Sequence, residues 1–258
     1  MSEAVMGKAS FLNHEGPIIT SMVQEVTPMG VKHLMDLSVQ DGAEAFGMQF
    51  CKIREEYRNE NVYRELFEYA NGKPVYITNY RHFTNENKTD EQIGEELVGF
   101  AKCGATLCDV MGDIYDKQPG EFTSDPKAVE KQKELIKRIH GAGAEVLMSS
   151  HIMKFTPAER VLEIALGQQS RGADISKIVV GAENMSEQIE NMKIIDLLKK
   201  NLKIPFLFLS GGESKIIRRI GGELGCCMYL CVARQDEYST AAQPLLRDVR
   251  LIRDMLRK

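Results

Sequence analysis

The chain has 258 residues, of which 43% are hydrophobic, and it carries a formal net charge of −4 at pH 7. A mildly acidic chain offers no broad basic surface for phosphate groups, so we expect no nucleic-acid partner. No run approaches the roughly 18 apolar residues of a membrane span, and the first residues lack the pattern of a signal peptide, so we expect a soluble, cytoplasmic protein with no membrane partner.

Short apolar runs alternate along the chain with segments whose apolar residues recur at helical spacing. Gly or Pro marks many of the changes between them, as at Gly104 and Pro205. Near-continuous apolar strands separated by helices are typical of a parallel sheet that is covered by helices. Eight such units predict a single (β/α)8 TIM barrel domain over residues 1–258, with 1–16 as an N-terminal extension; a doubly wound open sheet is the alternative. The predicted strands are 17–23, 45–50, 74–78, 105–111, 145–150, 175–180, 205–210 and 226–233.

Six cysteines lie mostly within apolar runs, among them Cys226, Cys227 and Cys231. They lack the paired spacing of a zinc site and the density of a disulfide scaffold. We therefore interpret them as core thiols and expect no bound metal.

His151 follows the fifth predicted strand and precedes a helical segment that starts near Pro157. Active sites of TIM barrels lie at the carboxyl ends of the strands, where Arg81, Asp109 and Ser210 are also expected. A histidine there can remove a proton and return it at neutral pH. The alternative is a structural histidine whose ring nitrogens bond to loop backbone.

Lys177 lies inside the sixth predicted strand, among the apolar residues Ile175, Ile178 and Val179. Burial favours the neutral amine of a lysine side chain, and a neutral amine attacks carbonyl carbon to form an imine. The alternative is a lysine whose stem packs at a strand edge while its head reaches water.

Four segments combine these residues with others in one order: SSHIMKFTP at 149–157, GADISKIVV at 172–180, SKIIRRIGGELG at 214–225 and STAAQ at 239–243. In this order and spacing they resemble type I 3-dehydroquinate dehydratase, over roughly residues 17–258. The resemblance implies that Lys177 forms the imine and that His151 is the general acid and base. It also implies a homodimer that needs no cofactor.

The same resemblance implies how a small carboxylate substrate is held. Arg219, after the seventh strand, matches the arginine that binds the carboxylate. Ser239 and Gln243 match a loop that closes over the substrate, and Arg81 matches an arginine after the third strand.

The chain departs from the family pattern at the second strand. The E-x-R-x-D signature that contacts substrate hydroxyls is replaced by Gln49, Cys51 and Ile53 at its three defined positions. Gln49 is then the residue expected to face the substrate there. Elsewhere, Ile152 replaces an aspartate, and Leu209 and Gly211 replace methionines of the pocket.

A carboxylate partner for His151 is less well defined by the pattern. An ungapped alignment places Asn85 at that position, and a shift of one residue places Glu86 there. Asp109, at the end of the fourth strand, is a third candidate. Each of these residues could instead cap a loop.

The implied reaction is the dehydration of 3-dehydroquinate to 3-dehydroshikimate by an imine-forming lyase. One alternative is a related imine-forming barrel, of the class I aldolase type or a divergent dehydratase, that acts on a different hydroxy-keto acid. Another is a barrel retained for binding or regulation without catalysis.

Overall fold

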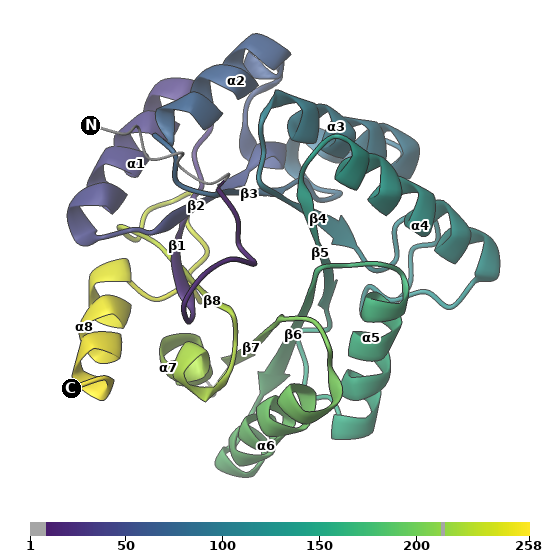
Figure 1. Ribbon diagram of the computed structural model, residues 1–258, viewed down its shortest axis with the longest axis vertical. Coiled ribbons are helices and arrows are strands. Elements are labelled where there is room, and N and C mark those ends of the chain that lie inside the picture. Colours follow the sequence, from purple (N-terminus) through teal and green to yellow (C-terminus); the bar gives the residue numbers. More distant parts are fainter. Residues whose placement is uncertain (1–8, 213–214) are drawn as a thin grey trace, which may run out of the picture.

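Eight parallel strands and the eight α-helices around them make up the part of the chain that the computed structural model describes, residues 9–212 and 215–258 (Figure 1). Neighbouring strands follow chain order from β1 to β7, and β8 pairs with β1 from the other side. This order forms a barrel and not a doubly wound sheet, so the TIM-barrel prediction is confirmed. The strands are β1 (Ile18–Val23), β2 (Ala45–Gln49), β3 (Val75–Thr78), β4 (Leu107–Met111), β5 (Glu145–His151), β6 (Ile175–Ala182), β7 (Phe206–Gly212) and β8 (Met228–Cys231).

The helices begin where the sequence supplies capping groups. Thr89 forms a capping box with Gln92 at the start of α3, and Asn184 accepts a hydrogen bond from the first turn of α6. None of the helices in the described residues is long and apolar enough to cross a membrane. The helices are α1 (Pro28–Asp41), α2 (Glu60–Tyr69), α3 (Asp90–Cys103), α4 (Pro126–Gly141), α5 (Ala158–Ser170), α6 (Met185–Asn201), α7 (Ile217–Leu224) and α8 (Leu246–Leu256).

Strand register places the candidate site in the upper part of the barrel interior. Ser149 on β5 lies beside Lys177 on β6, and His151 lies beside Val179, two residues closer to the carboxyl end. Alternate residues of a strand face the same side of the sheet, so Ser149 and His151 both point inward. The register therefore places Lys177 closer than His151 to the amino-terminal end of the barrel.

Gly47 on β2 makes room for the large side chains of this interior. A Cβ atom at Gly47 would lie 3.2 Å from the Tyr76 ring and 2.2 Å from the Met22 sulfur. The absence of a side chain lets Tyr76, a fully buried residue of β3, extend across the barrel.

The barrel is least complete between β7 and β8, which end the pairing order. Three alternate carbonyl groups of β7 find donors of different kinds: Phe206 O accepts from Cys227 N at 2.9 Å, Phe208 O from Cys226 Sγ at 3.5 Å, and Ser210 O from Arg218 Nε at 2.9 Å. Of these donors, only Cys227 N, which is nearest the amino-terminal end of β7, is a backbone group. Toward the carboxyl end, side chains from α7 and the loop after it therefore take over from the β8 ladder.

Residues 9–16 of the predicted N-terminal extension lie at the amino-terminal end of the barrel. The backbone N–H of Phe11 donates to Glu145 Oε2 at 2.9 Å, and the Phe11 side chain is buried. The division of the chain into one domain and a short extension stays a prediction. All six cysteines are free thiols, and only Cys227 among them is more than slightly exposed.

Two helical glycines give a matched test of how closely α7 approaches β8. A Cβ atom at Gly222 would lie 2.5 Å from the Tyr229 ring and 2.7 Å from Pro17, whereas Gly99 in α3 has no atom within 4 Å of the same position. We expect Gly222→Ala to lower the free energy of unfolding by about 1–3 kcal/mol through overpacking. Gly99→Ala should raise it by about 0.5–1 kcal/mol, because alanine favours the helix. Urea unfolding of both variants checks this, and equal effects would contradict the packing described for α7.

Candidate active site

Lys177 lies at the centre of the barrel with three acceptors around its amine. Its Nζ atom is 2.8 Å from Tyr80 Oη, 3.0 Å from Tyr76 Oη and 3.0 Å from Asp109 Oδ2. The residue is 3% exposed, so the alternative of a lysine head in water does not apply. Three acceptors match the three N–H groups that an ammonium ion offers.

Asp109 is the anion of this group. Burial, the largest single effect, raises the pKa of this carboxyl, but the charge of the adjacent Lys177, together with smaller effects such as the Tyr76 hydrogen bond, holds the pKa of Asp109 below its ordinary value. Both Tyr76 and Tyr80 donate their hydroxyl hydrogens to Asp109 Oδ2. Burial, reinforced by the Asp109 charge, raises the pKa of both phenols well above the ordinary value, so they remain donors.

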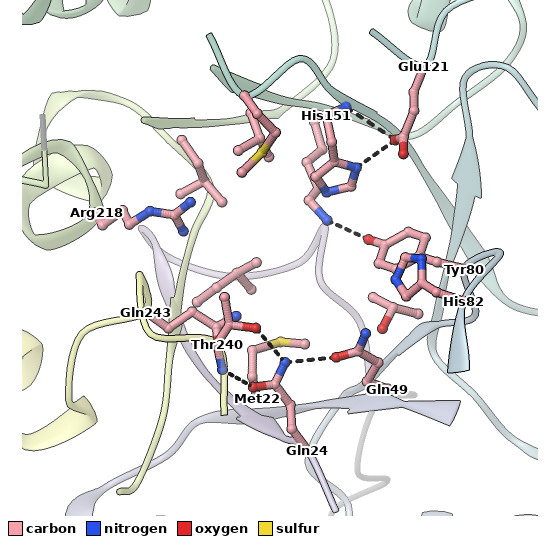
Figure 2. Close-up of a pocket in the computed structure, with 16 residues that line it drawn as sticks. Met22, Gln24, Gln49, Tyr80, His82, Glu121, His151, Arg218, Thr240 and Gln243 are labelled. Atoms are coloured by element: carbon pink, nitrogen blue, oxygen red, sulfur yellow. Dashed lines mark hydrogen bonds and ion pairs between the residues drawn. The ribbon is translucent and has the colours of Figure 1, made fainter. Parts of the chain in front are cut away.

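His151 is held by Glu121, from the loop between β4 and α4. Glu121 Oε2 lies 2.6 Å from His151 Nδ1 and accepts the His151 backbone N–H at 3.2 Å (Figure 2). A carboxylate accepts hydrogen bonds, so Nδ1 carries a proton, and in the neutral ring the lone pair is then on Nε2. In the described residues Nε2 has no hydrogen-bond partner, and it is therefore available to a ligand.

The loop that carries Glu121 is itself tightly fixed. Glu121 has a positive φ of 50°, and its carbonyl accepts from Ser150 Oγ at 2.7 Å. A Cβ atom at Gly112 would lie 2.5 Å from that carbonyl oxygen. Unfavourable backbone conformations of this kind persist where the surroundings hold them, often at functional sites.

One cavity of about 290 Å³ joins these groups, since Lys177, His151, Glu121 and Tyr80 all line it. The Tyr80 and His151 rings meet edge to face with centroids 5.2 Å apart. Tyr80 thus contacts both the amine and the imidazole.

Arg218, and not Arg219, reaches this cavity. The Arg218 residue is buried, its Nε donates to Ser210 O at 2.9 Å, and its guanidinium points into the cavity (Figure 2). Within residues 9–212 and 215–258 its two Nη atoms have no hydrogen-bond or ion-pair partner. Burial lowers the pKa of Arg218 to about 10, which leaves it cationic at neutral pH. Arg219 donates to the carbonyl of Lys215 and does not line the cavity, so of the two neighbours only Arg218 lies with Lys177 and His151.

Amide side chains form the wall of the cavity that lies across from His151 (Figure 2). Gln49 and Gln243, both predicted to contact substrate, line the cavity together with Gln24 and Thr240. Ser239 does not line it. Its hydroxyl bonds to the Asp236 carbonyl at 2.9 Å and to Gln235 Oε1 at 3.0 Å, so it stabilises the loop after β8.

Arg81 also lies away from the cavity. It pairs with Asp90 at 2.7 Å and with Asp113 at 2.8 Å, which ties the loops after β3 and β4 together. Tyr80, its neighbour, takes the inward position, because it continues the alternation of Tyr76 and Thr78 along β3.

Neither candidate partner from the loop after β3 contacts His151 in the described residues. Glu86 is exposed, and Asn85 is buried with its amide donating to Asn79 Oδ1 at 2.8 Å and to the Tyr80 carbonyl at 2.9 Å. Glu121 was missed because nothing in its local sequence distinguishes it from other loop acids. The usable signal was its place after the fourth strand, at the end of the barrel where active sites form.

Among the described residues, no group of three or more His, Cys, Asp or Glu side chains is placed to hold a metal ion.

Comparison with known proteins gives a family for this arrangement. A model of the type I 3-dehydroquinase family matches residues 121–258. The chain is 30% identical over 95 residues to 3-dehydroquinate dehydratase of Geobacillus thermodenitrificans, and 33% identical over 93 residues to that of Clostridium novyi. These alignments cover 36% and 35% of this chain and span 37% of the length of each relative.

Solved structures extend the likeness of fold over nearly the whole chain. The 3-dehydroquinate dehydratase of Geobacillus kaustophilus aligns with a TM-score of 0.79 at 16% identity, over 95% of this chain and 93% of that one. The enzyme of Clostridium difficile gives the same TM-score and identity, over 95% and 94%. The family model covers just over half of the 258 residues, and the chain therefore belongs to the type I 3-dehydroquinase family.

Proposed function

We propose that this protein is an imine-forming hydro-lyase that acts on 3-dehydroquinate or a closely related cyclic hydroxy-keto acid. The observation that carries the proposal is that one cavity contains the Lys177 amine, His151 Nε2 and the Nη atoms of Arg218, and that the last two have no partner among the described residues. A nucleophile, an acid–base group and a carboxylate binder are the three groups that the reaction requires.

In the proposed reaction, the Lys177 amine gives up a proton and adds to the ring ketone, and the ketone oxygen then leaves as water with that proton and one hydrogen of the amine, which gives a protonated imine. His151 Nε2 then removes a proton from the neighbouring carbon, and the electron pair moves into the imine to form an enamine. The enamine expels the hydroxyl group beyond that carbon, which leaves as water with the proton from the imidazolium. Addition of water to the imine releases the conjugated enone and the free amine.

The other residues of the cavity support these steps. The Glu121 carboxylate holds the ring of His151 and stabilises its imidazolium form. Arg218 binds the substrate carboxylate through its planar fork of N–H groups. Tyr76, Tyr80 and Asp109 hold the Lys177 amine in place until the substrate enters.

The setting of the reaction is also part of the proposal. Family membership supports a role in the shikimate pathway and a homodimer. Six free thiols support a reducing compartment such as the cytoplasm.

Borohydride trapping tests the role of Lys177. Reduction during incubation with 3-dehydroquinate should attach one ligand-sized mass to the peptide that contains Lys177, because only an imine is reducible there. Lys177→Met should lose both labelling and enone formation, and His151→Ala should retain labelling while its turnover falls by roughly 10²–10⁴. Peptide mass spectrometry and enone absorbance are the measurements; label on another lysine contradicts the mechanism.

Glu121 and Glu86 form a matched pair for testing which acid positions His151. Glu121→Gln should lower kcat by about tenfold or more and change the pH profile of kcat, because the imidazolium loses its anionic partner. Glu86→Gln should stay within about twofold of the unmodified protein, since exposed side chains away from a site have small effects. A loss of kcat in the Glu86 variant alone would return the role to Glu86.

Two neighbouring arginines allow the same design for the substrate carboxylate. Arg218→Ala should weaken substrate binding by about 1.5–3 kcal/mol, the usual contribution of a hydrogen bond to a charged group. Arg219→Ala should leave KM and kcat nearly unchanged. Thermal unfolding of both variants controls for the lost bond from Arg218 to Ser210. Equal KM values for the two variants would remove Arg218 from the proposed site.

A further inference from the structure

The three neighbours of the Lys177 amine differ in their access to the cavity. Tyr80 lines the cavity and is partly exposed, whereas Tyr76 and Asp109 are buried and do not line it. Tyr80 Oη lies 2.8 Å from Lys177 Nζ and donates to Asp109 Oδ2 at 2.6 Å. Of the three groups that contact the nitrogen, Tyr80 is therefore the one that a bound substrate can also contact.

Imine formation requires a group that moves protons at this position. The amine must lose a proton before it attacks, and the ketone oxygen must gain two hydrogens before it leaves as water. That oxygen is bonded to the carbon that Nζ attacks, so it comes within reach of a hydroxyl that already contacts Nζ. His151 is not a hydrogen-bond partner of Lys177 Nζ in residues 9–212 and 215–258.

We infer that Tyr80 is a catalytic residue that carries protons between the Lys177 amine, Asp109 and the substrate oxygen while the imine forms and while it is hydrolysed. The inference deepens the proposed function and rests on it for the imine at Lys177. His151 then acts on the carbon proton and on the departing hydroxyl group, and not on the nitrogen.

The protons pass through Tyr80 in three steps. First, the Lys177 ammonium gives a proton to Tyr80 Oη as the Tyr80 hydroxyl hydrogen moves to Asp109, which leaves a neutral amine and a neutral carboxyl. Next, the amine adds to the ketone carbon, and Tyr80 gives a hydrogen to the ketone oxygen while it takes one from the nitrogen, which forms a neutral carbinolamine. Finally, Tyr80 protonates the carbinolamine hydroxyl and regains a hydrogen from Asp109. The C–O bond breaks, water leaves, and the nitrogen lone pair forms the C=N bond of the protonated imine.

Burial of these groups suits them to this exchange of protons. Burial, reinforced by the Asp109 charge, raises the pKa of the Tyr80 phenol well above its ordinary value, so Tyr80 passes a proton on and does not keep a negative charge. The side chains of Lys177 and Asp109 are 4% and 0% exposed. Because burial penalises both of their charges, proton transfer to a neutral amine and a neutral carboxyl costs less there than in water.

The test follows oxygen exchange, which reports formation and hydrolysis of the imine without the elimination. The probe is 3-oxocyclohexanecarboxylate with oxygen-18 in its ketone group. This acid has no hydroxyl group to expel, and each cycle of imine formation and hydrolysis replaces its label with oxygen from water. Mass spectrometry measures the loss of label. The unmodified protein should accelerate this loss, and Lys177→Met should not; no acceleration by the unmodified protein overturns the inference.

Tyr76 and Tyr80 form a matched pair, because each hydroxyl contacts both Lys177 Nζ and Asp109 Oδ2. Replacing either residue with phenylalanine removes a hydroxyl bonded to the same two atoms, so the shared structural effect cancels in the ratio of the two rates. Tyr80→Phe should exchange oxygen at least about 10²-fold more slowly than Tyr76→Phe, the low end of the usual loss for an acid–base group. Equal rates overturn the inference, since Tyr80 would then only hold the amine.

His151→Ala provides a second comparison that does not depend on the folding of the tyrosine variants, which thermal unfolding checks. It should lose enone formation from 3-dehydroquinate and still exchange the ketone oxygen at least about tenfold faster than Lys177→Met, because Tyr80 remains. Exchange that falls to the rate of Lys177→Met in the His151 variant overturns the inference, since the imidazole would then carry these protons.

The outcomes also separate the inference from the proposed function. Exchange that depends on Tyr80, without enone formation from 3-dehydroquinate by the unmodified protein, supports the proton transfer by Tyr80 and refutes the lyase. Enone formation with a borohydride label on Lys177, together with equal exchange rates in the two tyrosine variants, supports the lyase and refutes the role of Tyr80.

Discussion

The buried ion pair of Lys177 and Asp109 is the constraint on which the rest of the site depends. Removing two charges from water costs several kcal/mol per ion, and their attraction offsets that cost only when the remaining donors and acceptors are also paired. Tyr76 and Tyr80 supply those bonds to both charges. Gly47 has no side chain, which leaves room for Met22 and for the Tyr76 ring beside it. The position of the Lys177 amine therefore depends on Gly47, Tyr76, Tyr80 and Asp109.

The incomplete pairing between β7 and β8 explains how the Arg218 guanidinium reaches the cavity. A closed ladder would satisfy Ser210 O with backbone, but Arg218 Nε takes that place and leaves the Nη atoms directed into the cavity. The helix that carries Arg218 can approach because Gly222 packs directly on Tyr229. A structural hydrogen bond therefore also orients the guanidinium that lines the cavity.

Local pattern in the sequence was sufficient for the strands and for the two central residues of the site. Each predicted strand overlaps an observed one, because buried parallel strands are short apolar runs and their ends are marked by Gly and Pro. Lys177 and His151 were found by residue type and place along a strand. Gln49 and Gln243 were found from the family pattern, and both line the cavity.

Only the tertiary structure decided which of two adjacent side chains faces the cavity. Tyr80 faces the cavity and Arg81 does not, because successive side chains of a strand point to opposite faces; Arg218 and Arg219 differ because neighbours on a helix point about 100° apart. A shift of one residue in a sequence match therefore changes which side chain is expected to line the cavity. Glu121 could not be found at all from the chain near His151, since it lies thirty residues away in the sequence. The sequence by itself determined the barrel and the places of Lys177 and His151 on its strands; the direction of each supporting side chain was decided by packing between segments distant in the chain.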